Sequence, residues 1–222
     1  HTANSVEQLA RDWQPEVAVI ATPPEYRLQV IERLPDLRGV LVEKPLGLTF
    51  TDAERFLKLC AERDILVQVN LWRRADETFR ALAAGQLVEL IGKPQAASGV
   101  YGNGLINNGT HIVDFARMLF GEVEEVRAGG GSVPCPAGPI DGDIHVPFNL
   151  TMRGGLPVAM LPIEFRNYRE LSLEIWGERA RLAIMNEGLS IFLYGRCENR
   201  AVQGAWEIDF ERPKMLQSTV GE

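Results

Sequence analysis

Apolar residues follow a repeating helix-and-strand pattern over the first 70 residues. The short runs at residues 17–21, 39–42 and 65–70 are almost continuously apolar, whereas the segments between them place apolar residues three or four positions apart. This alternation with short connections is typical of βαβ units, which form a parallel sheet. We therefore predict half of a doubly wound α/β domain, in which the strand at residues 17–21 is buried on both faces.

Capping signals indicate where the helices of this first domain begin. Ser5 with Gln8 matches a capping box, and so does Thr51 with Glu54. Between them, a helix is predicted from about Pro24 to Leu34.

The pattern changes after residue 70. Two helices, at about residues 75–84 and 110–120, flank a strand near residues 95–100. The remaining predicted strands lie at residues 143–152, 158–164, 170–175, 181–183, 191–194 and 206–210. Strands in series without intervening helices predict a mostly antiparallel sheet. We therefore divide the chain into an α/β domain at residues 1–70 and an α+β domain at residues 71–222.

Composition excludes several classes of partner. The 222 residues carry a net charge of −7 without a cluster of Lys and Arg, which argues against nucleic acid and anionic membranes as partners. No apolar run approaches the ~18 residues of a membrane-spanning helix. The three cysteines are far apart and the three histidines are scattered, so we predict reduced thiols in a cytoplasmic protein and no metal site.

The start of the chain departs from a complete doubly wound domain. The first residue is His1, and a helix signal comes before any strand. The glycines at Gly102, Gly104 and residues 129–131 do not have the spacing or the βαβ context of a dinucleotide-binding loop. We expect this sequence to be a segment of a longer protein.

Glu43, Lys44 and Pro45 follow a short apolar strand. In an open parallel sheet, ligands bind beyond the carboxyl ends of the strands, so a lysine at this edge is placed for chemistry. The alternative interpretation is a solvated Glu-Lys pair followed by a turn proline.

A second candidate site lies where residues 102–109 lead into a helix. Asn107, His111 and Asp114 are spaced i, i+4 and i+7, which would place them on one face of a helix. A histidine in the first turn is favoured in its neutral form by the helix dipole, and a neutral imidazole can accept a proton. The alternative is a structural, hydrogen-bonded histidine.

Arg73 and Arg74 follow the third predicted strand, at the junction of the two domains. Paired arginines can bind a carboxylate or a phosphate through two parallel hydrogen bonds. They are equally consistent with the solvated start of a helix.

Four motifs in this order resemble the Gfo/Idh/MocA family of NAD(P)-dependent oxidoreductases. They are residues 17–24, residues 40–46, residues 68–70 with the arginine pair, and residues 108–114. The resemblance implies a partial Rossmann domain followed by a domain with a large open sheet. It also implies NAD or NADP as cofactor, a sugar, sugar nucleotide or cyclic polyol as substrate, and a homo-oligomer formed through the C-terminal sheet. The Asn-Gly-Thr-His sequence is similar to members associated with polysaccharide or sugar-nucleotide metabolism.

The family's residue roles are carried over by position. Catalytic roles would fall to Lys44, which stabilises the developing oxyanion, and to His111, which takes the hydroxyl proton. The residues implied in cofactor binding are Thr22, Pro23, Glu43, Lys44 and Pro45, the last often in a cis peptide. The residues implied in substrate binding are Lys44, Arg74, Asn107 and His111.

Two departures from the family keep a second interpretation open. Many relatives carry aspartate where this chain has Asn107, and the glycine-rich loop of the first domain is absent from the sequence. The alternative to a sugar dehydrogenase or reductase is therefore a non-catalytic sugar-binding or dimerisation module that has lost its cofactor site.

Overall fold

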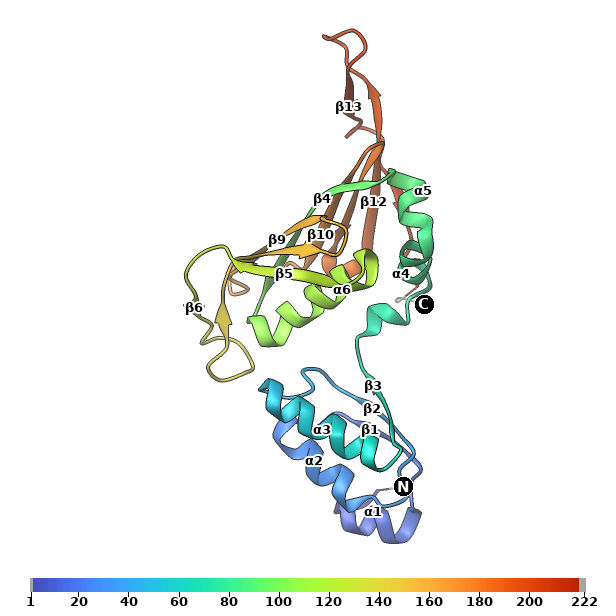
Figure 1. The fold of residues 1–222 in the computed structure, drawn as a ribbon, viewed down its shortest axis with the longest axis vertical. Helices are drawn as coiled ribbons and strands as arrows, with labels where there is room; N and C mark the ends of the chain where they lie inside the picture. Colours follow the sequence, from blue (N-terminus) through green and yellow to red (C-terminus); the bar gives the residue numbers. More distant parts are fainter. Residues whose placement is uncertain (1, 220–222) are drawn as a thin grey trace. The chain divides into compact units, whose positions relative to one another are not determined.

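The computed structural model describes residues 2–219, and the chain divides after Leu71 into two units. Each unit has its own hydrophobic core. Together they confirm the predicted fold class, a Rossmann-like parallel sheet followed by an α+β unit with a large sheet (Figure 1). None of the helices within residues 2–219 is long and apolar enough to cross a membrane.

The first unit contains three helices and three parallel strands in the order β1-β2-β3. The helices are α1 (Val6–Trp13), α2 (Pro24–Arg33) and α3 (Phe50–Glu62). The strands are β1 (Val17–Ile20), β2 (Gly39–Val42) and β3 (Leu66–Val69). Consecutive parallel strands joined through helices are the predicted βαβ arrangement.

Helix α3 begins earlier than the sequence predicts. Its N-cap is Thr49, whose hydroxyl accepts a hydrogen bond from the backbone N–H of Asp52 at 3.1 Å. The Asp52 carboxylate in turn accepts from the Thr49 N–H at 3.2 Å. The predicted capping box at Thr51 is therefore wrong, because the reciprocal bonds form two residues upstream.

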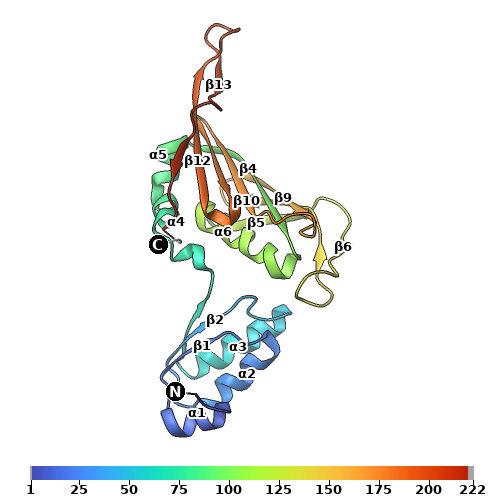
Figure 2. The same ribbon diagram turned by 180° about the vertical axis from the view of Figure 1, so that it is seen from behind.

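The sheet of the first unit is buried on one face only. The helices cover the face that includes Ile20 and Val42, which are 2% and 0% exposed (Figures 1 and 2). On the other face, Val17 and Val19 are 70% and 71% exposed. The prediction that residues 17–21 are buried on both faces is wrong, because the described helices all pack on the same side of the sheet.

The second unit is built around a nine-stranded sheet in the order β13-β12-β11-β10-β4-β9-β8-β5, with β14 also paired to β12. The strands of this sheet are β4 (Pro94–Gly102), β5 (Val123–Ala128), β8 (Phe148–Met152), β9 (Pro157–Ile163), β10 (Ser172–Gly177), β11 (Ala180–Met185), β12 (Ser190–Glu198), β13 (Trp206–Ile208) and β14 (Lys214–Leu216). A separate pair joins β6 (Val133–Pro134) to β7 (Ile144–His145). The main sheet is antiparallel except where β4 pairs with β9. Figure 2 shows the β12–β13 hairpin projecting beyond the other strands.

Helices α4 (Glu77–Ala81), α5 (Leu87–Ile91) and α6 (Thr110–Phe120) pack on one face of this sheet. A π-helical segment, Leu82–Gln86, joins α4 to α5. Helix α6 approaches β4 closely at Gly99. A Cβ atom there would lie 2.7 Å from Met160 Sδ and 2.8 Å from Ile112 Cγ1. The missing side chain of Gly99 therefore sets the distance between α6 and the sheet.

We expect Gly99→Val to destabilise the second unit by about 1–3 kcal/mol, because the new side chain overpacks a filled core. Gly195→Val is the matched control, since a Cβ at Gly195 meets nothing within 4 Å. The control should change the free energy of unfolding by no more than about 0.5 kcal/mol. Urea unfolding of both variants measures the difference, and equal stabilities would contradict this account of the contact.

Candidate functional site

One buried arginine ties together the turns after β1 and β2. Arg27 on α2 is 2% exposed. Its Nε donates to the Thr22 carbonyl oxygen at 2.9 Å, and its Nη1 donates to the Pro45 carbonyl oxygen. Burial lowers the pKa of Arg27, while the carboxylates of Glu43 and Glu25 oppose this effect. The two turns at this edge of the sheet are thus held at a fixed spacing.

Lys44 lies at this edge, two residues beyond the end of β2, and it is partly buried. The Lys44–Pro45 peptide bond is cis. Glu43 connects the neighbouring strand ends, because its Oε1 accepts from Asn70 Nδ2 at 2.5 Å and its Oε2 accepts from the Lys44 N–H at 3.3 Å. The structure therefore brings Thr22, Lys44 and Pro45 to the edge at which parallel sheets bind ligands.

In the second unit, the helix that carries His111 starts with a wide turn. The π turn (Leu105–Gly109) contains Asn107 and runs directly into α6, whose second residue is His111. The Thr110 hydroxyl donates to the carbonyl oxygens of Asn107 and Ile106, at 3.0 and 3.1 Å. A π turn holds more residues than an α turn. The placement of Asn107 and His111 on one face stays a prediction.

Arg74 and Asp114 form an ion pair that the sequence analysis did not predict. Arg74 Nε lies 2.9 and 3.0 Å from the two Asp114 carboxylate oxygens, and its Nη2 lies 2.7 Å from Oδ1. The side chains are 41% and 10% exposed. The contact fixes α6 three residues after His111. It also engages the guanidinium that the sequence analysis assigned to substrate, so substrate binding by Arg74 stays a proposal.

We expect Arg74→Gln to destabilise the second unit by roughly 1–2 kcal/mol. Removing one partner of a buried pair costs about 3–5 kcal/mol, and the partial exposure of Arg74 reduces this effect. Arg127→Gln, in an exposed pair with Glu125, is the control and should change stability by less than about 0.5 kcal/mol. Thermal unfolding compares the two variants, and equal losses would contradict a structural role for the Arg74–Asp114 pair.

Arg73 is a structural residue. It is 4% exposed, donates from Nε and Nη2 to the Glu187 carbonyl oxygen at 3.1 and 2.5 Å, and stacks 4.4 Å from the ring of Trp72. Burial lowers the pKa of Arg73 to about 10. The two neighbouring arginines thus have different partners. Arg73 binds the backbone carbonyl of Glu187, and Arg74 binds the carboxylate of Asp114.

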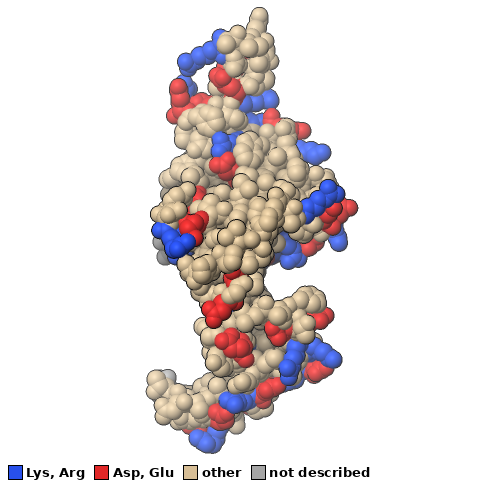
Figure 3. All heavy atoms as spheres, turned by 90° about the vertical axis from the view of Figure 1, so that its left-hand side faces the viewer, with Lys and Arg blue, Asp and Glu red and all other residues tan. Residues whose placement is uncertain are grey.

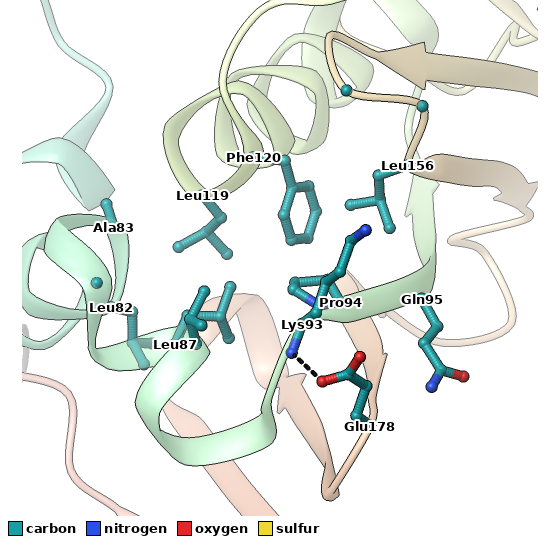
Figure 4. A pocket seen from close by; sticks show the side chains of 14 residues that line it. Leu82, Ala83, Leu87, Lys93, Pro94, Gln95, Leu119, Phe120, Leu156 and Glu178 are labelled. Atoms are coloured by element: carbon teal, nitrogen blue, oxygen red, sulfur yellow. Dashed lines mark hydrogen bonds between the residues drawn. The ribbon is translucent and has the colours of Figure 1, made fainter.

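A cavity of about 560 Å³ lies near the C-terminal end of α6. Figure 4 shows Leu119, Phe120 and Leu156 around it, with the Lys93 N–H donating to Glu178 at its rim. Its described lining includes none of the site residues predicted from the sequence. Within residues 2–219, no three His, Cys, Asp or Glu side chains gather as metal ligands.

Two residues that the sequence analysis did not select organise these sites. Arg27 holds the turns beside Lys44, and Asp143 accepts hydrogen bonds from the backbone of the π turn. Neither belongs to a short motif. An arginine near the start of α2, or an acidic residue in a loop, carries no signal in the sequence because its partners are backbone groups, which no residue type marks.

Comparison with known families gives a match in the first unit. Residues 1–71 match the family model GFO_IDH_MocA, described as an oxidoreductase family with an NAD-binding Rossmann fold. A curated relative, trans-1,2-dihydrobenzene-1,2-diol dehydrogenase of Mus musculus, is 27% identical over 145 residues, which cover 57% of this chain and 44% of the relative. The chain therefore spans less than half the length of this relative.

Solved structures share the fold across almost the whole chain. A super-repressor mutant of Gal80p from Saccharomyces cerevisiae superposes with a TM-score of 0.74 at 16% identity, covering 98% of this chain and 65% of Gal80p. A levoglucosan dehydrogenase, solved in complex with NADH and levoglucosan, gives 0.72 at 19% identity and covers 96% and 65% of the two chains. At these identities the likeness establishes the fold alone.

Proposed function

We propose that the protein is an NAD(P)-dependent dehydrogenase or reductase of the Gfo/Idh/MocA family, whose NAD-binding model matches residues 1–71. Its proposed substrate is a sugar, sugar nucleotide or cyclic polyol. The observation that carries the proposal is Lys44, which follows β2 at the carboxyl edge of a parallel sheet, within the segment that matches the family.

The residues at this edge fit a nicotinamide cofactor in their chemistry. Thr22 and Pro23 form the turn after β1, Lys44 follows β2, and Arg27 fixes the spacing of the two turns through their carbonyl groups. When bound, the nicotinamide supplies the acceptor or donor of a hydride. We assign Thr22, Pro23, Glu43, Lys44 and Pro45 to its binding, with the preference for NAD or NADP left open.

The chain's own residues would then handle the proton and the charge. His111 takes the hydroxyl proton of the substrate during oxidation, as a general base. The Lys44 ammonium donates to the oxygen as negative charge develops on it. Asn107 and Arg74 are the proposed substrate contacts.

Turnover assays on the full-length protein test this function. The substrates are trans-1,2-dihydrobenzene-1,2-diol, levoglucosan and a nucleotide sugar, each with NAD⁺ or NADP⁺, and the readout is formation of the reduced cofactor. Turnover of any of them is the expected result. If these compounds bind and no cofactor is reduced, the dehydrogenase proposal is wrong.

The second candidate is a non-catalytic sugar-binding or dimerisation module. Asn107 favours it, because an amide cannot ionise as the aspartate of many relatives does. The fold shared with Gal80p, whose solved form is named a super-repressor, also makes it a candidate. Binding without turnover in the same assays would support it.

We also propose a homo-oligomer formed through the C-terminal sheet. The sheet face turned away from α4, α5 and α6 presents Val100 and Leu161, the latter 49% exposed. One side of the second unit is uncharged over much of its centre (Figure 3). The core of a subunit interface is depleted of charged residues. Sedimentation of the full-length protein tests the proposal, and a monomer would contradict it.

A further inference from the structure

A buried aspartate from a distant segment caps the helical segment that leads to His111. Asp143 is 2% exposed and lies just before β7. Its Oδ1 accepts from the backbone N–H of Ile106 at 3.0 Å, and its Oδ2 accepts from the N–H of Asn107 at 3.0 Å. Oδ1 also accepts from the N–H of Ile144 at 2.8 Å. Both carboxylate oxygens are therefore engaged with backbone donors.

These donors are the ones that a helix start leaves without partners. The first N–H groups of a helix have no carbonyl acceptor within it, and an N-cap side chain normally supplies one. Here the N-cap is Gly104, which has no side chain, and Ile106 and Asn107 are the second and third residues that follow it. Asp143 supplies the missing acceptor from 37 residues downstream of Ile106. Its negative charge also suits the positive end of the helix dipole.

Gly104 is shaped for this contact. Its φ is +96°, a conformation that residues with a side chain rarely adopt. A Cβ atom at Gly104 would lie 1.9 Å from Asp143 Oδ2. The absent side chain therefore leaves the space that the carboxylate fills. No other residue type allows Asp143 to reach the Ile106 and Asn107 amides in this arrangement.

The residues that follow Asp143 bind the same loop along its length. His145 Nε2 accepts from the Gly104 N–H at 3.1 Å. The hydroxyl of Tyr101, which is fully buried, donates to the Val146 carbonyl oxygen at 2.6 Å and accepts from the Val146 N–H at 3.1 Å. We call residues 143–146 the clamp. It fixes where the π turn begins, and so where Asn107 and His111 lie.

We propose that Asp143 is a positioning residue, which acts through the π turn to hold Asn107 and His111 in the positions from which they would contact substrate. The proposal rests on the proposed dehydrogenase function, in which these two residues meet substrate. The amides that Asp143 binds belong to Asn107 itself and to the residue before it. Loss of the carboxylate should therefore loosen the site while the sheet behind it stays in place.

Amide hydrogen exchange tests the contact without any need for activity. Asp143→Asn keeps the shape of the side chain but replaces one acceptor by a donor. The Ile106 and Asn107 amides should exchange about tenfold faster or more, because one of them then faces an NH2 donor and the other keeps only a neutral acceptor in place of a charged one. Amides of the central strand β10 should not change. Asp141→Asn, an exposed aspartate two residues upstream, is the control and should leave every rate unchanged. Unchanged exchange at Ile106 and Asn107 in Asp143→Asn overturns the proposal.

Kinetics on the full-length protein separate positioning from general stability. Per folded molecule, Asp143→Asn should lower kcat by about tenfold or more, while KM for the nicotinamide cofactor stays unchanged. The proposed cofactor residues lie on the first unit, which explains the split. Faster amide exchange with unchanged kcat would overturn the positioning role. Should Asp143→Asn fail to fold, Asp143→Ser takes its place in both measurements, since it is smaller and keeps a hydroxyl acceptor.

A wild-type protein without turnover would refute the proposed function and leave the clamp testable. In that case the imidazole NMR signal of His111 tests whether Asp143 positions this residue. The chain has three histidines, so the signal can be assigned readily. A moved or broadened His111 signal in Asp143→Asn, with no change in Asp141→Asn, supports positioning. An unmoved signal in both variants overturns it.

Discussion

Replacing Lys44 by methionine is expected to lower the turnover of the full-length protein by about 10²–10³-fold. Methionine keeps the length and apolar stem of the side chain and removes the ammonium that would stabilise charge on the substrate oxygen. Since Lys44 is partly buried and lies two residues beyond the end of β2, its stem still packs in the variant and the melting temperature should stay within a few degrees. Steady-state rates and thermal unfolding measure the two effects.

Lys58→Met is the matched control for that variant. Lys58 lies on α3 of the same unit, in an exposed pair with Glu62. Its replacement should leave turnover unchanged. Equal rates for Lys44→Met and the wild type would remove Lys44 from the mechanism, whereas equal losses in both variants would point to a general effect of lost charge.

The second large effect is expected for His111→Gln. Glutamine can still form a hydrogen bond but cannot accept a proton, so turnover should fall by about 10²–10⁴-fold. In the wild type, alcohol oxidation should slow as the pH falls, because a protonated imidazole no longer acts as a base. This acid limb should be missing in the variant. A pH–rate profile of both proteins checks it, and an unchanged acid limb in His111→Gln would assign the proton transfer to another group.

The sequence predicts the layout of this protein well, because its helices and strands differ clearly in period. The apolar runs at β1, β2 and β3 give a parallel sheet, and the series of strands after residue 120 gives an antiparallel one, as observed. Strand ends and helix caps are less certain. Thr49 and Thr51 both stand near the start of α3, and only backbone geometry determines which one is the cap.

The prediction that β1 is buried on both faces of the sheet is wrong for a different reason. An apolar run shows that a strand can be covered on two sides, while the coverage itself depends on where other elements pack. In the described residues α1, α2 and α3 all lie on one side, so Val17 and Val19 stay exposed. The parallel contact of β4 with β9 also lies beyond any local signal, since these strands are far apart along the chain.

The residues of the candidate site also differ in whether the sequence alone can identify them. Lys44, Asn107 and His111 are visible in the sequence because each lies in a short motif at the end of an element. Arg27 and Asp143, which hold these segments, are not visible in the sequence, because they bind backbone atoms that no residue type marks. Arg74 and Asp114 were both noticed, but their pairing depends on how residues 40 positions apart come together in the fold.

Transfer of deuterium from substrate to cofactor tests whether the protein carries out hydride transfer. The full-length protein is mixed with NAD⁺ or NADP⁺ and with trans-1,2-dihydrobenzene-1,2-diol or levoglucosan that carries deuterium on the carbons bearing hydroxyl groups. Mass spectrometry then follows the nicotinamide. We expect deuterium in the reduced cofactor with the wild type, and little or none with Lys44→Met and His111→Gln. A cofactor that remains oxidised and unlabelled with every substrate, in a folded protein that binds it, would contradict the account.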